Sequence, residues 1–213
     1  MRTDDLVTML ANGAGAVQPN QTERRFATAI AWGALGAALL MVTLLGLRAD
    51  LAAAFLLPMF WVKVAFAASL AAVSLFAALR LSRPGMLLTW APGVVAAPVL
   101  AMWLLAAIVL ARADTAQRAL LFFGNSWDEC PFLIALLSVP AFVAAMWAMK
   151  GLAPTRLRLA GAAAGLLAGA VGALVYCLHC TEMTAPFIGF WYLLGMLIPS
   201  AAGALLGPRL LRW

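Results

Sequence analysis

Residues 159–178 read LAGAAAGLLAGAVGALVYCL, and this uncharged stretch decides the class of the protein. A helix needs about 20 apolar residues to cross roughly 30 Å of hydrocarbon, so the stretch has the length of one membrane span. Five further segments share its length and apolar character: Phe26 to Leu47, about Leu56 to Leu79, Met86 to Ala111, Pro131 to Met149 and Ala185 to Leu206. With 66% hydrophobic and only 10% charged residues among 213, the chain is far more apolar than a soluble domain. The sequence therefore predicts an all-α fold, a bundle of six transmembrane helices.

Within this stretch, glycines recur every three or four residues, at positions 161, 165, 169 and 172. Small residues at this spacing let helix backbones approach closely, so that van der Waals packing holds the helices together. Gly203 and Gly207 repeat the pattern more weakly in the sixth segment. We therefore expect the glycine face of the fifth helix to pack tightly against neighbouring helices.

The basic residues indicate which way the helices cross, because short cytoplasmic loops collect Lys and Arg. If the N-terminus is cytoplasmic, ten of the fourteen basic residues lie on the inner side: Arg2, Arg24, Arg25, Arg80, Arg83, Lys150, Arg156, Arg158, Arg209 and Arg212. Three lie in outer loops, at positions 48, 112 and 118. The distribution predicts an N-in, C-in topology. It also assigns the net charge of +6 to anionic lipid headgroups rather than to nucleic acid.

Lys63 is the one charged residue within the six segments. It lies near the start of the second, so we expect its ammonium group to extend back to the membrane interface. No charged residue lies near the middle of a span. This disfavours a metal permease, because transporters normally place such groups near the midplane.

The first 25 residues form a polar segment that begins with a short amphipathic helix. Its features are Thr3 as N-cap, Asp4 and Asp5 in the first turn, and an apolar face of Leu6, Met9 and Leu10. Asn12-Gly13 ends the helix, and a flexible tether follows. An isolated helix of about ten residues is marginal in water, so we expect it to fold only when a partner offers a groove. The alternative is a frayed tail or a helix on the membrane surface. The two carboxylates suit an anionic membrane surface poorly.

Three cysteines and the only histidine gather at one end of the predicted bundle. Cys130 opens the fourth span, and the fifth ends with Cys177, His179 and Cys180. In an N-in topology both places face the periplasm. The short turn from Gly151 to Arg158 makes these two spans antiparallel neighbours, so Cys130 and Cys180 could meet.

Several kinds of site fit this group. In an oxidising compartment two close thiols tend to form a disulfide. A soft-metal site is the other hypothesis, because thiolate and imidazole suit zinc, cadmium or copper. Its ligands would be Cys130, Cys180 and His179, with Glu182 as an auxiliary ligand. Cys177 begins a CxxC, but a second CxxC is missing, so this motif is weak.

Simpler roles exist for two of these residues. Cys177 has the size of a small apolar residue that packs inside the last helical turn. His179 fits a polar cap at the membrane interface. Both roles stay open beside those of auxiliary thiol and metal ligand.

Four short motifs, spread over the whole chain, carry a resemblance to a known family. They are Met1 to Leu6 (MRTDDL), Cys130-Pro131-Phe132, Leu178 to Glu182 (LHCTE) and Gly207-Pro208-Arg209. In this order they resemble the NrsF family, six-span inner-membrane negative regulators of an extracytoplasmic-function sigma factor in proteobacteria. The resemblance implies that the cytoplasmic N-terminal segment holds the sigma factor. It further implies that an outer-face pair, matching Cys130 and Cys180, controls release under heavy-metal or oxidative stress, with Cys177 an addition to the pattern.

We therefore expect two parts: residues 1–25, a cytoplasmic sigma-factor-binding segment and tether, and residues 26–213, a six-helix transmembrane sensor. The expected function is that of a non-enzymatic anti-sigma factor of the bacterial inner membrane. Its partners would be the sigma factor and the lipid bilayer, without direct contact to nucleic acid. No cofactor is obligatory, and a soft metal ion would bind only transiently. The alternatives are a metal permease and a membrane thiol–disulfide oxidoreductase, which would usually need a second dithiol.

Overall fold

The computed structural model describes residues 2–13, 20–83, 85 and 91–212, and the regular structure within these ranges is entirely helical. The elements are α1 (Thr3–Gly13), α2 (Gln21–Leu40), η1 (Met41–Leu45), α3 (Leu51–Ala54), α4 (Pro58–Leu81), α5 (Ala91–Arg112), α6 (Thr115–Phe123), α7 (Cys130–Lys150), α8 (Leu157–Tyr176), α9 (Ala185–Phe187), η2 (Ile188–Tyr192) and α10 (Leu193–Leu210). The elements η1 and η2 are π-helical turns. The predicted all-α class is confirmed for this part of the chain.

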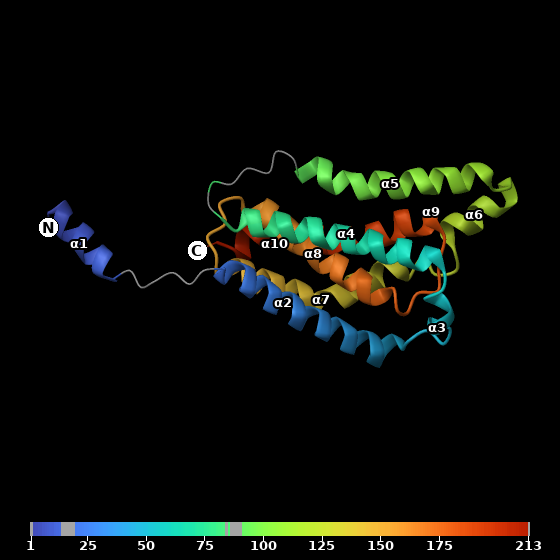
Figure 1. Cartoon of the computed structure of the whole chain (residues 1–213), viewed down its shortest axis with the longest axis horizontal. Helices are drawn as coiled ribbons and strands as arrows, with labels where there is room; N and C mark the ends of the chain where they lie inside the picture. The colour runs from blue at the N-terminus through green and yellow to red at the C-terminus, as the bar shows by residue number, and fades with distance from the viewer. Residues whose placement is uncertain (1, 14–19, 84, 86–90, 213) are drawn as a thin grey trace.

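Six helices are long and apolar enough to cross a membrane, as predicted, and they form an elongated bundle (Figure 1). They span Gln21–Leu45, Pro58–Leu81, Gly93–Arg112, Cys130–Lys150, Leu157–Tyr176 and Ala185–Leu210. The first begins earlier than expected, so the helix includes the last residues assigned to the tether. Part of the third predicted span, residues 86–90, lies outside the described residues. The arrangement is compatible with a multi-pass membrane protein.

Prolines fix where several of these helices begin. Pro58 opens α4, and Pro131 lies in the first turn of α7, directly after Cys130. Proline suits this position because its missing N–H would have no partner there. Cys130 is thereby held at the very start of a helix, at one end of the bundle.

Helix α8 forms the centre of the bundle and packs against α4, α7 and α10. The apolar 18-residue stretch of α8 is 72% buried, whereas that of the outlying α5 is 11% buried. Gly161 and Gly165 pack on the backbone of α10, and Gly172 packs on the backbone of α7 near Ser138. The predicted tight packing of the glycine face is confirmed.

The bundle has two distinct ends (Figure 1). The end that holds the start of α2 and the C-terminus is called the terminal end. The opposite end holds the connection from η1 to α3, helix α6, the start of α7 and the turn that follows α8, and it is called the distal end. Helix α1 lies apart from the bundle, beyond the terminal end.

The short helix α1 differs in detail from the prediction. It begins at Thr3 itself, and the carboxylate of Asp5, 3.2 Å away, accepts a hydrogen bond from the backbone N–H of Arg2. Thr3 is thus the first helical residue rather than the residue before the helix. The apolar face of Leu6 and Leu10 is exposed. Folding of this segment on a partner stays a prediction.

Candidate functional site at the distal end

All three cysteines lie buried in one hydrophobic cluster at the distal end, and all are free thiols. Cys130 is the first residue of α7, Cys177 directly follows α8, and Cys180 closes the turn after it. The antiparallel packing of α7 on α8 brings these segments together. Cys130 and Cys177 are 0% exposed and Cys180 is 3% exposed, so all three thiols are shielded from solvent.

Two tyrosines stand among the thiols. The hydroxyl of Tyr176 interacts with the Cys130 thiol, and Tyr192 lies beside Cys177 and Cys180. The centroids of the two tyrosine rings are 5.7 Å apart. The Tyr192 hydroxyl is buried and has no hydrogen-bond partner among the described residues that meets the usual geometry. Both tyrosine side chains thus belong to the thiol cluster.

The turn that carries Cys180 is bound to the segment after η1. The Nδ1 atom of His179 lies 2.9 Å from the carbonyl oxygen of Gly46. The backbone N–H of Arg48 donates to the carbonyl of Leu178 over 3.3 Å, and Nη1 of the same residue donates to the carbonyl of Cys180 over 3.1 Å. Gly46 has a φ of 77°, which a glycine adopts without strain, so the chain can bend sharply at this point.

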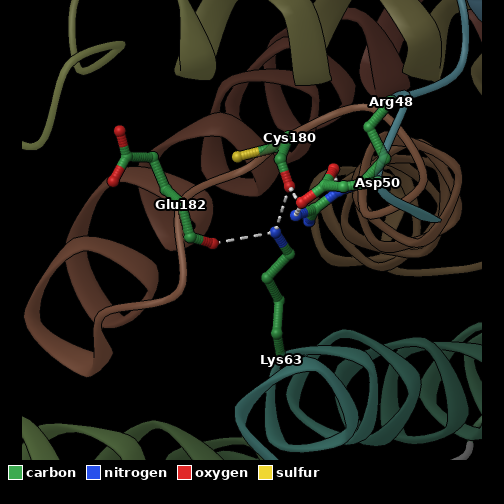
Figure 2. A network of polar contacts seen from close by, with 5 residues as sticks. All are labelled: Arg48, Asp50, Lys63, Cys180 and Glu182. Carbon is green, nitrogen blue, oxygen red and sulfur yellow. Dashed lines mark hydrogen bonds and ion pairs between the residues drawn. The ribbon is translucent and has the colours of Figure 1, made fainter. Parts of the chain in front are cut away.

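Lys63 reaches the same carbonyl from α4. Its Nζ donates to the carbonyl oxygens of Cys180 and Glu182 over 2.9 and 3.0 Å (Figure 2). The same atom lies 5.1 Å from the ring centroid of Tyr192. The residue is 0% exposed. Its ammonium group therefore extends to the distal end of the bundle, where it is enclosed by protein and does not reach solvent. Backbone carbonyls of the distal turn replace water as its hydrogen-bond partners.

Arg48 is paired with Asp50 as well. Its Nε and Nη2 atoms each donate to one carboxylate oxygen over 2.7 Å, and the side chains are 4% and 56% exposed, respectively. This pairing raises the pKa of Arg48 and holds the pKa of Asp50 below its usual value. Asp50 therefore fixes a nearly buried guanidinium group in the orientation that reaches Cys180.

The other two expected ligands point elsewhere. His179 is engaged with Gly46, and the carboxylate of Glu182 accepts hydrogen bonds from the backbone N–H and Nδ2 of Asn125 over 2.8 and 3.4 Å. Figure 2 shows this carboxylate directed away from Lys63. Among the described residues, no three or more His, Cys, Asp or Glu side chains form a group that could hold a metal ion. The metal site of Cys130, Cys180 and His179 stays a prediction.

Helix α6 covers the distal end beside the thiol cluster. The indole N–H of Trp191 donates to the carbonyl of Phe122 over 2.9 Å, and Thr184 Oγ1 donates to the carbonyl of Leu121 over 2.8 Å. The ring of Phe122 packs edge-on against Trp191, and the ring of Trp127 packs against it in a tilted orientation. These contacts hold the start of the sixth span in place and help to bury the cysteines.

The six residues expected to bind a partner lie far from the thiols in the sequence and in the fold. They are all on α1, and every one is exposed: Thr3, Asp4, Asp5, Leu6, Met9 and Leu10. Figure 1 shows α1 beyond the terminal end, opposite the end at which α7 begins and α8 ends, and these two segments carry the thiols. Any signal between the two must therefore run along the bundle.

The sequence predicts no site role for Arg48, Asp50, Tyr176 or Tyr192. One signal was available, since Lys63 is the sole charge in the six predicted spans. A second is the Arg-x-Asp spacing of the charged pair in the loop before it. Neither signal identifies a backbone carbonyl more than a hundred residues away as the partner.

Comparisons with known proteins agree with one another. The family NrsF, described as negative regulator of sigma F, matches residues 10–213. The chain is 63% identical over 213 residues to the probable anti-sigma-F factor NrsF of Azospira oryzae, with both chains covered in full. It is 41% identical over 219 residues to the anti-sigma-F factor NrsF of Caulobacter vibrioides, again over the full length of both. No solved structure matches the chain.

Proposed function

The chain belongs to the NrsF family of negative regulators of sigma F, and from this premise we propose that it is a membrane-bound anti-sigma factor with a thiol sensor. It sequesters an extracytoplasmic-function sigma factor through α1. It releases that factor when Cys130 and Cys180 react with a heavy metal or an oxidant. The role is regulatory and not enzymatic.

The observation that carries the proposal is full-length similarity to two anti-sigma-F factors. The separation of two features supports the sensing part. Helix α1 offers an exposed apolar face at the terminal end, and free thiols are gathered at the distal end. A receptor for signals from one compartment and a binding element in another need this separation.

The proposed orientation places both termini in the cytoplasm and the cysteines on the periplasmic side of the inner membrane. Ten basic residues on one side against three on the other support it. A cytoplasmic α1 can meet a sigma factor. A periplasmic thiol cluster meets metals and oxidants before they enter the cell.

Two chemical events at the thiols are compatible with the proposal. In oxidation, the thiols of Cys130 and Cys180 lose two protons and two electrons to the oxidant and form one S–S bond. In metal binding, both thiols lose their protons, and the thiolates bind a soft cation. Either event links the start of α7 to the turn after α8. The reacted state therefore differs from the free-thiol state in the bond between these two segments.

Co-purification from the native host tests the function. Tagged full-length protein is solubilised from membranes of cells grown with and without cadmium or diamide, and the eluate is probed for sigma factors by mass spectrometry. We expect one extracytoplasmic-function sigma factor to co-elute from untreated cells and to be depleted after treatment. A Cys130→Ser variant should retain it under both conditions. Absence of any sigma factor from untreated wild-type eluates would contradict the proposal.

A further inference from the structure

The carbonyl oxygen of Cys180 accepts hydrogen bonds from two cationic side chains that come from different segments of the chain. Arg48 Nη1 approaches from the segment after η1, and Lys63 Nζ approaches from α4 (Figure 2). A carbonyl with two lone pairs is thereby saturated by charged donors. Hydrogen bonds to charged groups are stronger than those between neutral ones.

The burial of Lys63 makes this arrangement costly to build. The described residues form two salt bridges, Arg48 with Asp50 and Arg83 with Glu23, and neither includes Lys63. A fully buried ammonium group without a carboxylate is destabilising unless fixed dipoles solvate it. The carbonyls of Cys180 and Glu182 supply those dipoles. The position of the thiol turn and the position of Lys63 therefore depend on each other.

The same turn is mechanically joined to α2. Arg48 follows η1, which continues α2 through the π-helical turn at Met41–Leu45. Such turns contain an extra residue per turn, and they often mark functional sites in helices. A displacement of the turn that carries Cys180 is thus passed to the distal end of α2.

Helix α2 also lies against the helix that carries the other sensor thiol. Gly33 of α2 is so close to Ala141 of α7 that an added Cβ would lie 2.5 Å from its Cα, and Gly36 is similarly close to Pro140. Because α7 begins at Cys130, α2 is in contact with both thiol-bearing elements. If α7 and the turn that carries Cys180 move relative to each other, α2 must shift as well, because closely packed interfaces do not deform continuously.

We propose that Arg48 and Lys63 form a latch on the Cys180 carbonyl, through which the thiol turn sets the position of α2 and hence of the N-terminal segment. The latch rests on the proposed function for its biological output. It is closed in the free-thiol state. Bonding of Cys180 to Cys130 withdraws the carbonyl from the two cations, so η1 and the distal end of α2 are released.

The test uses full-length protein in lipid nanodiscs and two latch variants. Lys63→Met removes the buried cation and keeps an unbranched side chain of similar length. Arg48→Gln keeps a hydrogen-bond donor but removes the charge. This variant carries the test if the Lys63→Met protein does not accumulate. Arg118→Met is the matched control, because this arginine lies on α6 at the same end and, within the described part of the chain, donates to the nearby carbonyl of Ala113.

The first measurement is hydrogen exchange of peptides that cover residues 41–50, with free thiols and after diamide. In the wild type, diamide should increase the exchange rate by about tenfold or more, as loss of a charge-assisted hydrogen bond implies. In both latch variants the rate should already be raised with free thiols, and Arg118→Met should behave as wild type. Wild-type exchange rates in a well-accumulated Lys63→Met protein would overturn the latch. Unchanged exchange in diamide-treated wild type with a formed disulfide would overturn it too.

The second measurement is sigma-factor affinity of the same samples. The wild type should bind the sigma factor more weakly after diamide than before it. The ratio of the dissociation constants after and before diamide should fall to about twofold or less in the latch variants. An undiminished ratio in both variants contradicts the latch. If wild-type protein binds no sigma factor in either state, the proposed function fails instead, and the exchange measurement alone decides on the latch.

Discussion

Gly161 of α8 and Gly203 of α10 are in backbone-to-backbone contact. They are so close that a Cβ built on either residue would overlap the carbonyl oxygen of the other. Association of helices in lipid lacks a hydrophobic driving force, so it depends on such close packing. The neighbouring Gly165 and Gly207 extend the contact along both helices. The α8–α10 interface therefore fixes the core against which the distal site is built.

Gly161→Ala should destabilise the protein by about 1–3 kcal/mol, towards the upper end, because the added methyl group meets backbone and not a movable side chain. Gly93→Ala is the control, since a Cβ at this helical glycine of α5 meets nothing within 4 Å. Denaturant titration of the purified proteins in detergent, followed by helical circular dichroism, measures the difference. Equal midpoints for the two variants would show that the interface can relax.

Much of the fold could be predicted because its signals are local. Each span is a contiguous apolar segment, and the glycine spacing in α8 reports directly on close packing. The short helices α3 and α6 and the π-helical turns could not be foreseen. Their apolar residues, such as Phe122, are stabilised by contacts with distant segments and not by a periodic pattern of their own.

The candidate site could be predicted only in part. The topology placed Cys130 and Cys180 at one end of the bundle, since both border spans. The role of Lys63 was missed because its partners are backbone carbonyls, which every residue carries and no sequence distinguishes. Asp50 was missed because its function is to hold another side chain, Arg48.

Asp50→Asn should lower the stability of the distal end, because it removes the anion that orients a nearly buried guanidinium group. The pKa of Asp50 is lowered by the Arg48 hydrogen bond, so the pair's contribution is fully present above the usual carboxyl pKa of 3.8. It is lost as the pH falls through the still lower pKa of the folded state. Arg48 has a raised pKa and stays charged throughout this range.

Thermal unfolding of wild type and Asp50→Asn between pH 3 and 7 checks the sign. The wild type should have the higher midpoint near neutrality, and the two curves should converge at the acidic end. A constant gap across this range would mean that the carboxylate charge is not what stabilises the pair.

The orientation is best tested with cysteines in exposed loops, because the three native thiols are buried. Gln117→Cys in α6 and Thr155→Cys in the connection between α7 and α8 are both exposed positions, at opposite ends of the bundle. In a background without native cysteines, an impermeant maleimide should label Gln117→Cys in intact spheroplasts and Thr155→Cys only after lysis. The reverse pattern would place the sensor thiols in the cytoplasm.

Cys130→Ser and Cys180→Ser should abolish induction of the sigma regulon by cadmium and diamide while the protein still accumulates in the membrane. Cys177→Ala should have a milder effect, because Cys177 is buried directly after α8 and packs there as a small apolar residue. A regulon reporter and a membrane immunoblot measure both properties. Loss of response in Cys177→Ala with retained response in Cys180→Ser would reassign the working pair.

A variant of His179 distinguishes a metal-binding role of this residue from a structural one. If it binds the metal, His179→Ala should lose the cadmium response and keep the diamide response. If its role is the contact with Gly46, both responses should fall together. Dose–response curves of the regulon reporter for the two inducers distinguish these outcomes, and Glu182→Ala provides the same comparison for the carboxylate held by Asn125.

Leu6→Asp or Leu10→Asp should release the sigma factor and activate its regulon without an inducer. Each leucine contributes roughly 1.5–3 kcal/mol when buried in a groove, so the change should weaken binding by about ten- to a hundredfold. Thr8→Asp is the matched control, because it adds the same charge to α1 on the side away from the leucines. Sigma-factor affinity of the purified protein and membrane content measure the two effects. If the regulon stays repressed in both leucine variants and the proteins insert correctly, α1 is not the binding element. The loops at residues 80–84 and 150–158 then become the next surfaces to test.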